Sequence, residues 1–269
     1  MAKLPHTATS TTAPVAYPDD HHTSQRQSSP PTQPPPARQS STDKHQIVWQ
    51  MAHELRIPLT AMLGFAQMLI NPESSKPLDP QQRGYVTQIL AAGDHLLQVI
   101  NELLEIATAR AGHLPIERAP IAPRALLAEA RDQLAPLASA KSQRMTLRAP
   151  DTLPTVKVDH VRMRQVLLNL LGNAIQFAPV GSEITLGAQP ASDGAVDFFV
   201  HNRGTVIPRA DQRLIFQPFA RGPQPPSDAP HGAGLGLAIA QELVQSHGGT
   251  IWVRSSQRHG TTFWVRLPR

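Results

Sequence analysis

A histidine and a glutamate stand side by side where the sequence reads Ala-His-Glu-Leu-Arg-Ile-Pro-Leu-Thr, at residues 52–60. A neutral imidazole becomes a useful nucleophile when a carboxylate holds its other ring N–H, because this fixes the tautomer and raises the basicity. Glu54 is such a neighbour for His53. Pro58 should kink the surrounding helix by removing one backbone hydrogen bond, which suits a site that opens and closes. The pair alone also fits an ordinary solvated helix face.

Two asparagines interrupt an apolar run further along the chain, at residues 166–174. Asn169 and Asn173 are four residues apart and therefore share one face of a helix. Buried amides need hydrogen-bond partners. Their oxygens can also ligate Mg²⁺, an ion that keeps several waters and binds substrate phosphates. A single capping or network-forming asparagine is the alternative interpretation.

Three glycines, Gly232, Gly234 and Gly236, stand directly before a predicted helix. Glycines allow close backbone approach to phosphates, and a helix N-terminus offers free N–H groups to an anion. The glycines end an irregular Pro- and Gly-rich stretch at 202–235. Irregular loops this long are usually functional and often act as lids.

The elements that must position these residues begin with two long helices. The first starts with Thr42 or Asp43 as its N-cap, and the second runs from Pro80 to Ala109, after a loop at Asn71 to Asp79. Wide apolar stripes at helical and heptad spacing predict a helical hairpin, and a two-fold dimer making a four-helix bundle covers such stripes economically. Packing of the hairpin on its own C-terminal domain is the alternative.

A second, mixed region follows residue 118. Helices alternate with mostly antiparallel strands, which predicts an α/β two-layer sandwich. The helices are expected at 122–139, 160–177 and 236–247, and the strands at 144–148, 155–158, 182–188, 195–201, 249–255 and 261–267.

Composition separates off the N-terminal region and excludes several classes of protein. Pro, Ser and Thr make up half of residues 1–42, so we expect a disordered tail there. The chain has no Cys, which excludes disulfides and Cys-based zinc sites. No apolar run reaches the roughly 20 residues of a membrane span, and no signal peptide opens the chain, so cytoplasmic localisation is expected. The formal charge of +5 comes with no nucleic-acid motif, so we expect no nucleic-acid partner.

Taken together and in this order, the motifs resemble those of the bacterial sensor histidine kinases of two-component systems. The resemblance covers roughly residues 45–269. The first part is a phosphoacceptor box at 52–60. The second is a Bergerat-type ATPase domain, with its asparagine box at 165–177, glycine boxes at 200–208 and 232–236, and a phenylalanine box at 215–221. Two further motifs, His247-Gly-Gly-Thr-Ile and Gly260-Thr-Thr-Phe, match the C-terminal end of the family pattern.

The resemblance implies a role for each matching residue. His53 would be phosphorylated by ATP on a ring nitrogen, and Glu54 would accept the proton from the other nitrogen. Asn173 would ligate Mg²⁺. Asn169 would line the same pocket as Asn173. The adenine would be bordered by Asn202, Gly204 and Thr261. The lid near the phosphates would contain Gly232, Gly234 and Gly236, and the packing of Phe216 and Phe219 would anchor it.

Four positions depart from the family pattern. Asn202 replaces an Asp that accepts a hydrogen bond from the adenine amino group, although the Asn carbonyl oxygen still accepts. Val206 replaces a glycine, so the local backbone must differ, because a β-branched residue disfavours positive φ. Ile57 replaces a polar residue that orients water for dephosphorylation of the regulator, which predicts weak phosphatase activity. Gln176 replaces a basic residue and removes one phosphate contact.

These observations predict three parts: a tail at 1–42, a dimerisation and phosphoacceptor domain at 43–112, and an ATP-binding catalytic domain at 118–269. The predicted function is that of a soluble, homodimeric histidine kinase that uses ATP and Mg²⁺. It passes the phosphoryl group to a response-regulator receiver domain. The signal is expected to come through a partner, such as a separate sensor protein. The alternative is a degenerate kinase that binds nucleotide weakly and acts as a dimeric signalling or phosphotransfer module.

Overall fold

The structure, a computed structural model, describes residues 39–71, 78–112, 114–191, 193–220 and 233–269. For residues 39–54 it describes the backbone alone. The predicted tail therefore lies almost wholly outside the described residues.

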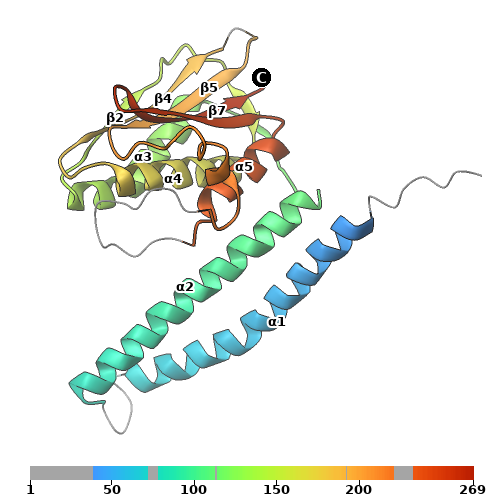
Figure 1. Cartoon of the computed structure of the whole chain (residues 1–269), viewed down its shortest axis with the longest axis vertical. Coiled ribbons are helices and arrows are strands. Elements are labelled where there is room, and N and C mark those ends of the chain that lie inside the picture. The colour runs from blue at the N-terminus through green and yellow to red at the C-terminus, as the bar shows by residue number, and fades with distance from the viewer. Residues whose placement is uncertain (1–38, 72–77, 113, 192, 221–232) are drawn as a thin grey trace, which may run out of the picture. The chain divides into compact units, whose positions relative to one another are not determined.

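Helices α1 (Gln39–Ile70) and α2 (Pro80–Arg110) run side by side as a hairpin (Figure 1). Asp79 begins α2 with a reciprocal cap, in which its Oδ1 accepts from the Gln82 N–H at 2.8 Å and Gln82 Oε1 accepts from the Asp79 N–H at 3.2 Å. The pair packs closely at Gly93, where an added Cβ would lie 2.4 Å from Leu63 Cδ2 and the leucine side chain would have to move. The prediction of a helical hairpin is confirmed.

The predicted start of α1 is wrong, because the helix begins at Gln39 and both Thr42 and Asp43 lie inside it. The first turn is entirely polar, so no apolar periodicity could reveal it. Pro58 also lies inside α1, and the helix continues on both sides of it. Leu63 and Ala66 are buried beyond the proline, so packing holds the helix past the missing backbone hydrogen bond.

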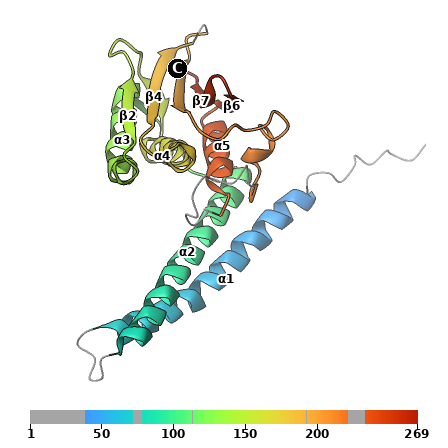
Figure 2. The ribbon, with the colours of Figure 1, turned by 60° about the vertical axis from the view of Figure 1, so that its left-hand side comes forward.

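The C-terminal region is a five-stranded sheet with helices packed on one face (Figures 1 and 2). The strand order is β2-β4-β5-β7-β6, and every neighbouring pair is antiparallel except β2 and β4. The strands are β2 (Arg144–Arg148), β4 (Glu183–Pro190), β5 (Val196–Asn202), β6 (Thr250–Ser256) and β7 (Gly260–Leu267). The helices are α3 (Pro123–Ala140), α4 (His160–Phe177) and α5 (Gly236–Ser246). The predicted two-layer α/β sandwich is confirmed.

Two short elements were not predicted. Strand β1 (Ala119–Ile121) pairs antiparallel with β3 (Val156–Val158), and a single 3₁₀ turn forms η1 (Leu214–Phe216). Each contains three residues, which is too short for a periodic pattern to be visible in the sequence.

Helix α4 is the centre of the core. Met163, Val166, Leu167, Leu170 and Leu171 are at most 1% exposed. The helix contacts both α3 and α5 and lies against β4 and β5. Its apolar face is therefore enclosed on three sides, and its asparagines are carried by the remaining face.

A buried histidine joins the N-terminus of α4 to the C-terminus of α5. His247 is 2% exposed; its Nε2 accepts from the Asp159 N–H at 3.0 Å, and its Nδ1 lies 2.7 Å from the Leu243 carbonyl oxygen. Because Nε2 must accept, the ring is neutral. Burial lowers the pKa of His247, and the charge of Arg118 lowers it further.

Asp159 completes this joint by capping α4. Its carboxylate accepts from the Arg162 N–H at 3.1 Å and from the Glu117 N–H at 3.1 Å. Burial acts to raise the pKa of Asp159, but these backbone donors outweigh it and the pKa is lowered. One carboxylate and one imidazole thus hold together α4, α5 and the segment that follows α2.

The free energy of unfolding should fall as the pH is lowered from 7.5 to 5.5. Above its ordinary pKa of 6.5, His247 is neutral in both states, whereas below that value the unfolded chain binds the proton first. The lowered pKa of His201, caused by burial and by Arg203, acts in the same direction. Denaturant unfolding followed by circular dichroism measures the slope. His247→Asn should reduce the slope, whereas His95→Asn, at an exposed position on α2, should leave it unchanged. Equal slopes in wild type and His247→Asn would contradict this account.

Candidate functional site

The two asparagines of α4 differ in their surroundings. Asn169 donates from Nδ2 to the Gly236 carbonyl oxygen at 2.9 Å, which ties α4 to the first residue of α5. Its Oδ1 stays available as an acceptor. Asn173 lies one turn further along the same face, is half-buried, and receives no side-chain hydrogen bond from the residues that the structure describes. Asn173 can therefore offer its amide oxygen to an ion or ligand.

A second group of predicted residues meets at the ends of β5 and β7. Asn202 and Thr261 face each other across the two strands and are 2% and 3% exposed. Thr261 Oγ1 lies 2.6 Å from Ser255 Oγ, which in turn accepts from the Ile207 N–H at 2.9 Å. Among the described residues, the side chain of Asn202 has no hydrogen-bond partner. The amide atoms of Asn202 are not fully enclosed, so water or a ligand can reach them.

Gly204 joins this strand end to the end of α4. A Cβ at Gly204 would lie 2.2 Å from the Phe177 carbonyl oxygen and 2.8 Å from Asn202 Nδ2, so only glycine fits. Gly204 also borders a cavity of about 360 Å³. The cavity is lined by Phe177, Pro179, Arg203, Thr205, Gln257, Arg258 and Gly260 as well. None of the other predicted nucleotide-binding residues lines it.

The two ends of the predicted lid are held together. The Phe219 N–H donates to the Gly234 carbonyl oxygen at 3.0 Å, and Gly234 has a φ of +72°. Phe216 is buried and meets Phe263 edge to face, with ring centroids 6.3 Å apart, so its predicted packing is confirmed. The prediction for Phe219 is wrong: its φ of +62° leaves the side chain 56% exposed. Gly232 lies outside the described residues.

The phosphoacceptor candidates lie on α1. His53 and Glu54 are helical, and their side chains lie outside the described residues. Ile57 follows His53 by four residues, and its side chain is 62% exposed. This spacing puts Ile57 on the same face of the helix as His53, one turn away.

The backbone at Val206 avoids the conformation that valine disfavours. Val206 is not among the residues with positive φ, so valine is accommodated without strain. The hydrogen bond from Ile207 to Ser255 fixes this segment against β6. Sequence reasoning missed Ser255, because an isolated serine in a strand carries no functional pattern.

The arrangement fits a nucleotide with its metal. No cluster of three or more His, Asp or Glu side chains that could hold a metal ion occurs in the described parts of the chain. A Mg²⁺ ion would therefore depend on the Asn173 amide, water and substrate phosphates, a donor set that this ion accepts. The unpartnered amide of Asn202 suits the hydrogen-bonding edge of a base.

Comparison with known proteins agrees with this geometry. Residues 43–112 match the family model of the His Kinase A (phospho-acceptor) domain, and residues 158–269 match that of the histidine kinase-, DNA gyrase B- and HSP90-like ATPases. These two domains define a phosphoacceptor hairpin joined to a histidine kinase-type ATPase. The chain belongs to the sensor histidine kinases of two-component systems.

Individual relatives support the same family. The sensor protein GacS of Pseudomonas syringae pv. syringae is 34% identical over 81% of this chain and 24% of GacS. The circadian input-output histidine kinase CikA of Thermosynechococcus vestitus is 36% identical over 80% of this chain and 29% of CikA. The structure of full-length ShkA in complex with AMPPNP superposes with a TM-score of 0.72, at 33% identity over 83% of this chain and 45% of ShkA. The chain thus spans less than half the length of these relatives. No helix in the described residues is long and apolar enough to cross a membrane.

Gly204→Ala should lower the free energy of unfolding by roughly 1–3 kcal/mol, because the added methyl group collides with the Phe177 carbonyl. Gly172→Ala on α4 is the matched control: nothing lies within 4 Å of its added Cβ, and alanine should raise stability by up to about 1 kcal/mol. Denaturant titration of both variants measures the difference. Two variants of equal stability would show that the close contact at Gly204 is not required.

Proposed function

We propose that this chain is an ATP-dependent histidine kinase that phosphorylates its own His53 and passes the phosphoryl group to an aspartate of a response-regulator receiver domain. One observation carries the proposal: a histidine in a matched phosphoacceptor domain occurs in the same chain as an ATPase-type site in which the side chains of Asn173 and Asn202 lack partners among the described residues. Because ATP and receiver domains are cytoplasmic, we place the activity in the cytoplasm.

The reaction requires mainly that the protein position the γ-phosphate next to His53. A ring nitrogen of His53 forms a bond to the γ-phosphorus, the bond from that phosphorus to the bridging oxygen breaks, and ADP leaves. Glu54 takes the proton from the other ring nitrogen, which keeps the attacking nitrogen nucleophilic. Asn202, Gly204 and Thr261 hold the adenine end, Asn169 and Asn173 hold the phosphate end, and Gly232, Gly234 and Gly236 cover the phosphates. The Asn173 amide oxygen would hold Mg²⁺, which would supply positive charge to the phosphates.

A homodimer is part of the proposal. The described part of the hairpin leaves many large apolar side chains about half exposed or more. These are Leu55, Ile57, Met62, Phe65, Met68, Leu69, Tyr85, Ile89 and Leu96. A second hairpin packed against this surface makes a four-helix bundle and removes it from water. The input signal arrives through a partner, such as a separate sensor protein.

A degenerate kinase is the second candidate. Asn202 forms a weaker hydrogen bond to an adenine amino group than a carboxylate does, because charged acceptors bind more strongly. Gln176 lacks the charge of the basic residue that it replaces, so one phosphate contact is lost. The accommodation of Val206 without strain favours the active enzyme.

Incubation with γ-labelled ATP and Mg²⁺ should label the wild-type protein with an acid-labile, alkali-stable phosphate. His53→Gln should abolish the label while leaving binding of a fluorescent ATP analogue unchanged, because the nucleotide site lies in the other domain. His95→Gln, an exposed histidine on α2, serves as the matched control and should retain the label. Absence of label from wild type together with tight nucleotide binding would favour the phosphotransfer module.

Ile57→Thr should speed dephosphorylation of a phosphorylated regulator in the presence of ADP, because the hydroxyl can orient an attacking water and Ile cannot. We expect an increase of about tenfold or more, equivalent to about 1.4 kcal/mol. Ile57→Val, which has the shape of the threonine variant without its hydroxyl group, is the control. Rapid dephosphorylation by wild type, or no gain in Ile57→Thr, would contradict this role.

A further inference from the structure

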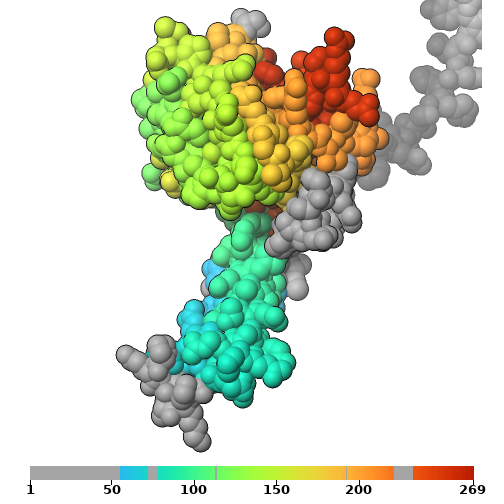
Figure 3. Space-filling view, turned by 90° about the vertical axis from the view of Figure 1, so that its left-hand side faces the viewer, coloured from blue at the N-terminus to red at the C-terminus, as the bar shows by residue number. Residues whose placement is uncertain are grey.

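The five-stranded sheet has two edge strands in the described parts of the chain, β2 and β6, and the groove described below lies beside β2. Strand β2 is the first strand of the order and pairs only with β4. A free edge presents backbone N–H and C=O groups to any extended chain that approaches. The space-filling view in Figure 3 shows residues of this region, in yellow-green, at the near surface.

The orientation of the free backbone groups follows from one hydrogen bond. The Arg144 N–H donates to the Ser182 carbonyl oxygen at 3.0 Å, so Arg144 directs its backbone groups toward β4. In a strand the direction alternates, so Thr146 also faces β4, whereas Met145 and Leu147 direct theirs outward. The edge therefore offers the free backbone N–H and C=O groups of Met145 and Leu147, two residues apart, which is the spacing that an added strand requires.

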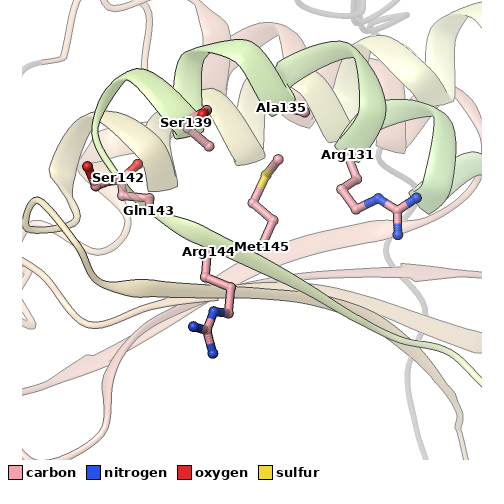
Figure 4. A pocket seen from close by; sticks show the side chains of 8 residues that line it. Arg131, Ala135, Ser139, Ser142, Gln143, Arg144 and Met145 are labelled. Carbon is pink, nitrogen blue, oxygen red and sulfur yellow. The ribbon is translucent and has the colours of Figure 1, made fainter.

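A groove of about 480 Å³ runs beside this edge, between β2 and α3. Figure 4 shows Arg131 of α3 and Met145 of β2 directed into the space between helix and strand, and Arg144 directed to the other face of the strand. The remaining lining residues are Ala135, Ala138, Ser139, Ser142 and Gln143. The small side chains of α3 leave room for alternate side chains of an added strand.

One residue that lines the groove, Gln143, has an unsatisfied polar atom that is enclosed by the protein. Gln143 is 7% exposed, and its Nε2 donates to the carbonyl oxygens of Ile175, Ala178 and Pro179 at 3.1, 3.0 and 3.2 Å. Its Oε1 is buried and has no hydrogen-bond partner. An acceptor left in this state needs a donor that the described residues do not supply.

Charges select the kind of occupant. Arg144 and Arg148 are exposed on β2 and make no ion pair among the described residues, while Arg131 shares its charge with Asp132 at 2.7 Å. Glu183, the cross-strand partner of Arg144 on β4, accepts a hydrogen bond from Thr146 Oγ1 at 2.6 Å. With two arginines against one glutamate, the exposed face of β2 is positive on balance. A second copy of β2 paired antiparallel about Thr146 would set Arg144 against Arg148, and this repulsion disfavours self-association.

We propose that the groove between α3 and β2 binds an extended, acidic segment of a partner protein as an added sixth strand. Its backbone pairs with Met145 and Leu147, its acidic side chains meet Arg144 and Arg148 on the exposed face of β2, and its apolar side chains enter the groove beside Met145. This docking surface does not depend on the proposed kinase activity.

The test uses the full chain and a fluorescein-labelled peptide of alternating glutamate and valine. The peptide should bind and should slow amide exchange at Met145 and Leu147, resolved by NMR, while exchange at Thr146, already bonded to β4, stays unchanged. Peptides with lysine in place of glutamate, or with a central proline, should bind at least tenfold more weakly. Equal binding of all three peptides would overturn the proposal.

Two variants separate pairing from charge. Met145→Pro removes an outward N–H without removing a bond to β4, and it should weaken peptide binding at least tenfold. The double variant Arg144→Glu with Arg148→Glu, both exposed on β2, should do the same with circular dichroism unchanged, whereas Arg209→Glu, exposed elsewhere, should bind as wild type. If the amides of Met145 and Leu147 are already protected without peptide, the chain covers its own edge. If protection rises with protein concentration, a second copy covers it. Either result would refute a partner segment.

Discussion

The enclosure of α4 is the constraint on which the rest of the catalytic domain depends. Its apolar face, which includes Leu170 and Leu171, is sealed between the sheet, α3 and α5. Rotation of the helix would expose this surface at a cost of about 25 cal/mol per Å². The remaining face is therefore fixed in direction, and Asn169 and Asn173 are fixed with it. The residues proposed to bind the nucleotide and the residues that form the core thus lie on two different faces of the same helix.

The ends of α4 are held by polar contacts that packing alone could not provide. At its N-terminus, Asp159 caps the helix and its backbone N–H is accepted by the neutral ring of His247. At its C-terminus, Gln143 binds the carbonyl oxygens of Ala178 and Pro179, close to the contact of Phe177 with Gly204. The same domain is joined to α2 by Glu105, which binds both Arg162 and Gln165 of α4. These contacts set where the amides of α4 stand relative to the strand ends.

The nucleotide site and the groove at β2 leave different groups unsatisfied. In the first, the amide side chains of Asn173 and Asn202 lack partners, which suits a ligand bearing phosphates and a base. In the second, backbone groups of an edge strand lack partners, which suits a peptide. Unsatisfied groups of these two kinds distinguish a small-molecule site from a docking surface within one domain.

The sequence by itself determined the hairpin, the order of the main helices and strands, and the motifs that identify the family, because these depend on local periodicity and on residue types at short spacing. It could not reveal β1 or η1, which are too short, or the start of α1, whose first turn is polar. It also placed both Phe216 and Phe219 in the packing, although a positive φ turns Phe219 outward. Only the tertiary structure decided the partners of Asn169, the necessity of glycine at 204, and the free edge of β2, because each depends on which distant segments the core brings into contact.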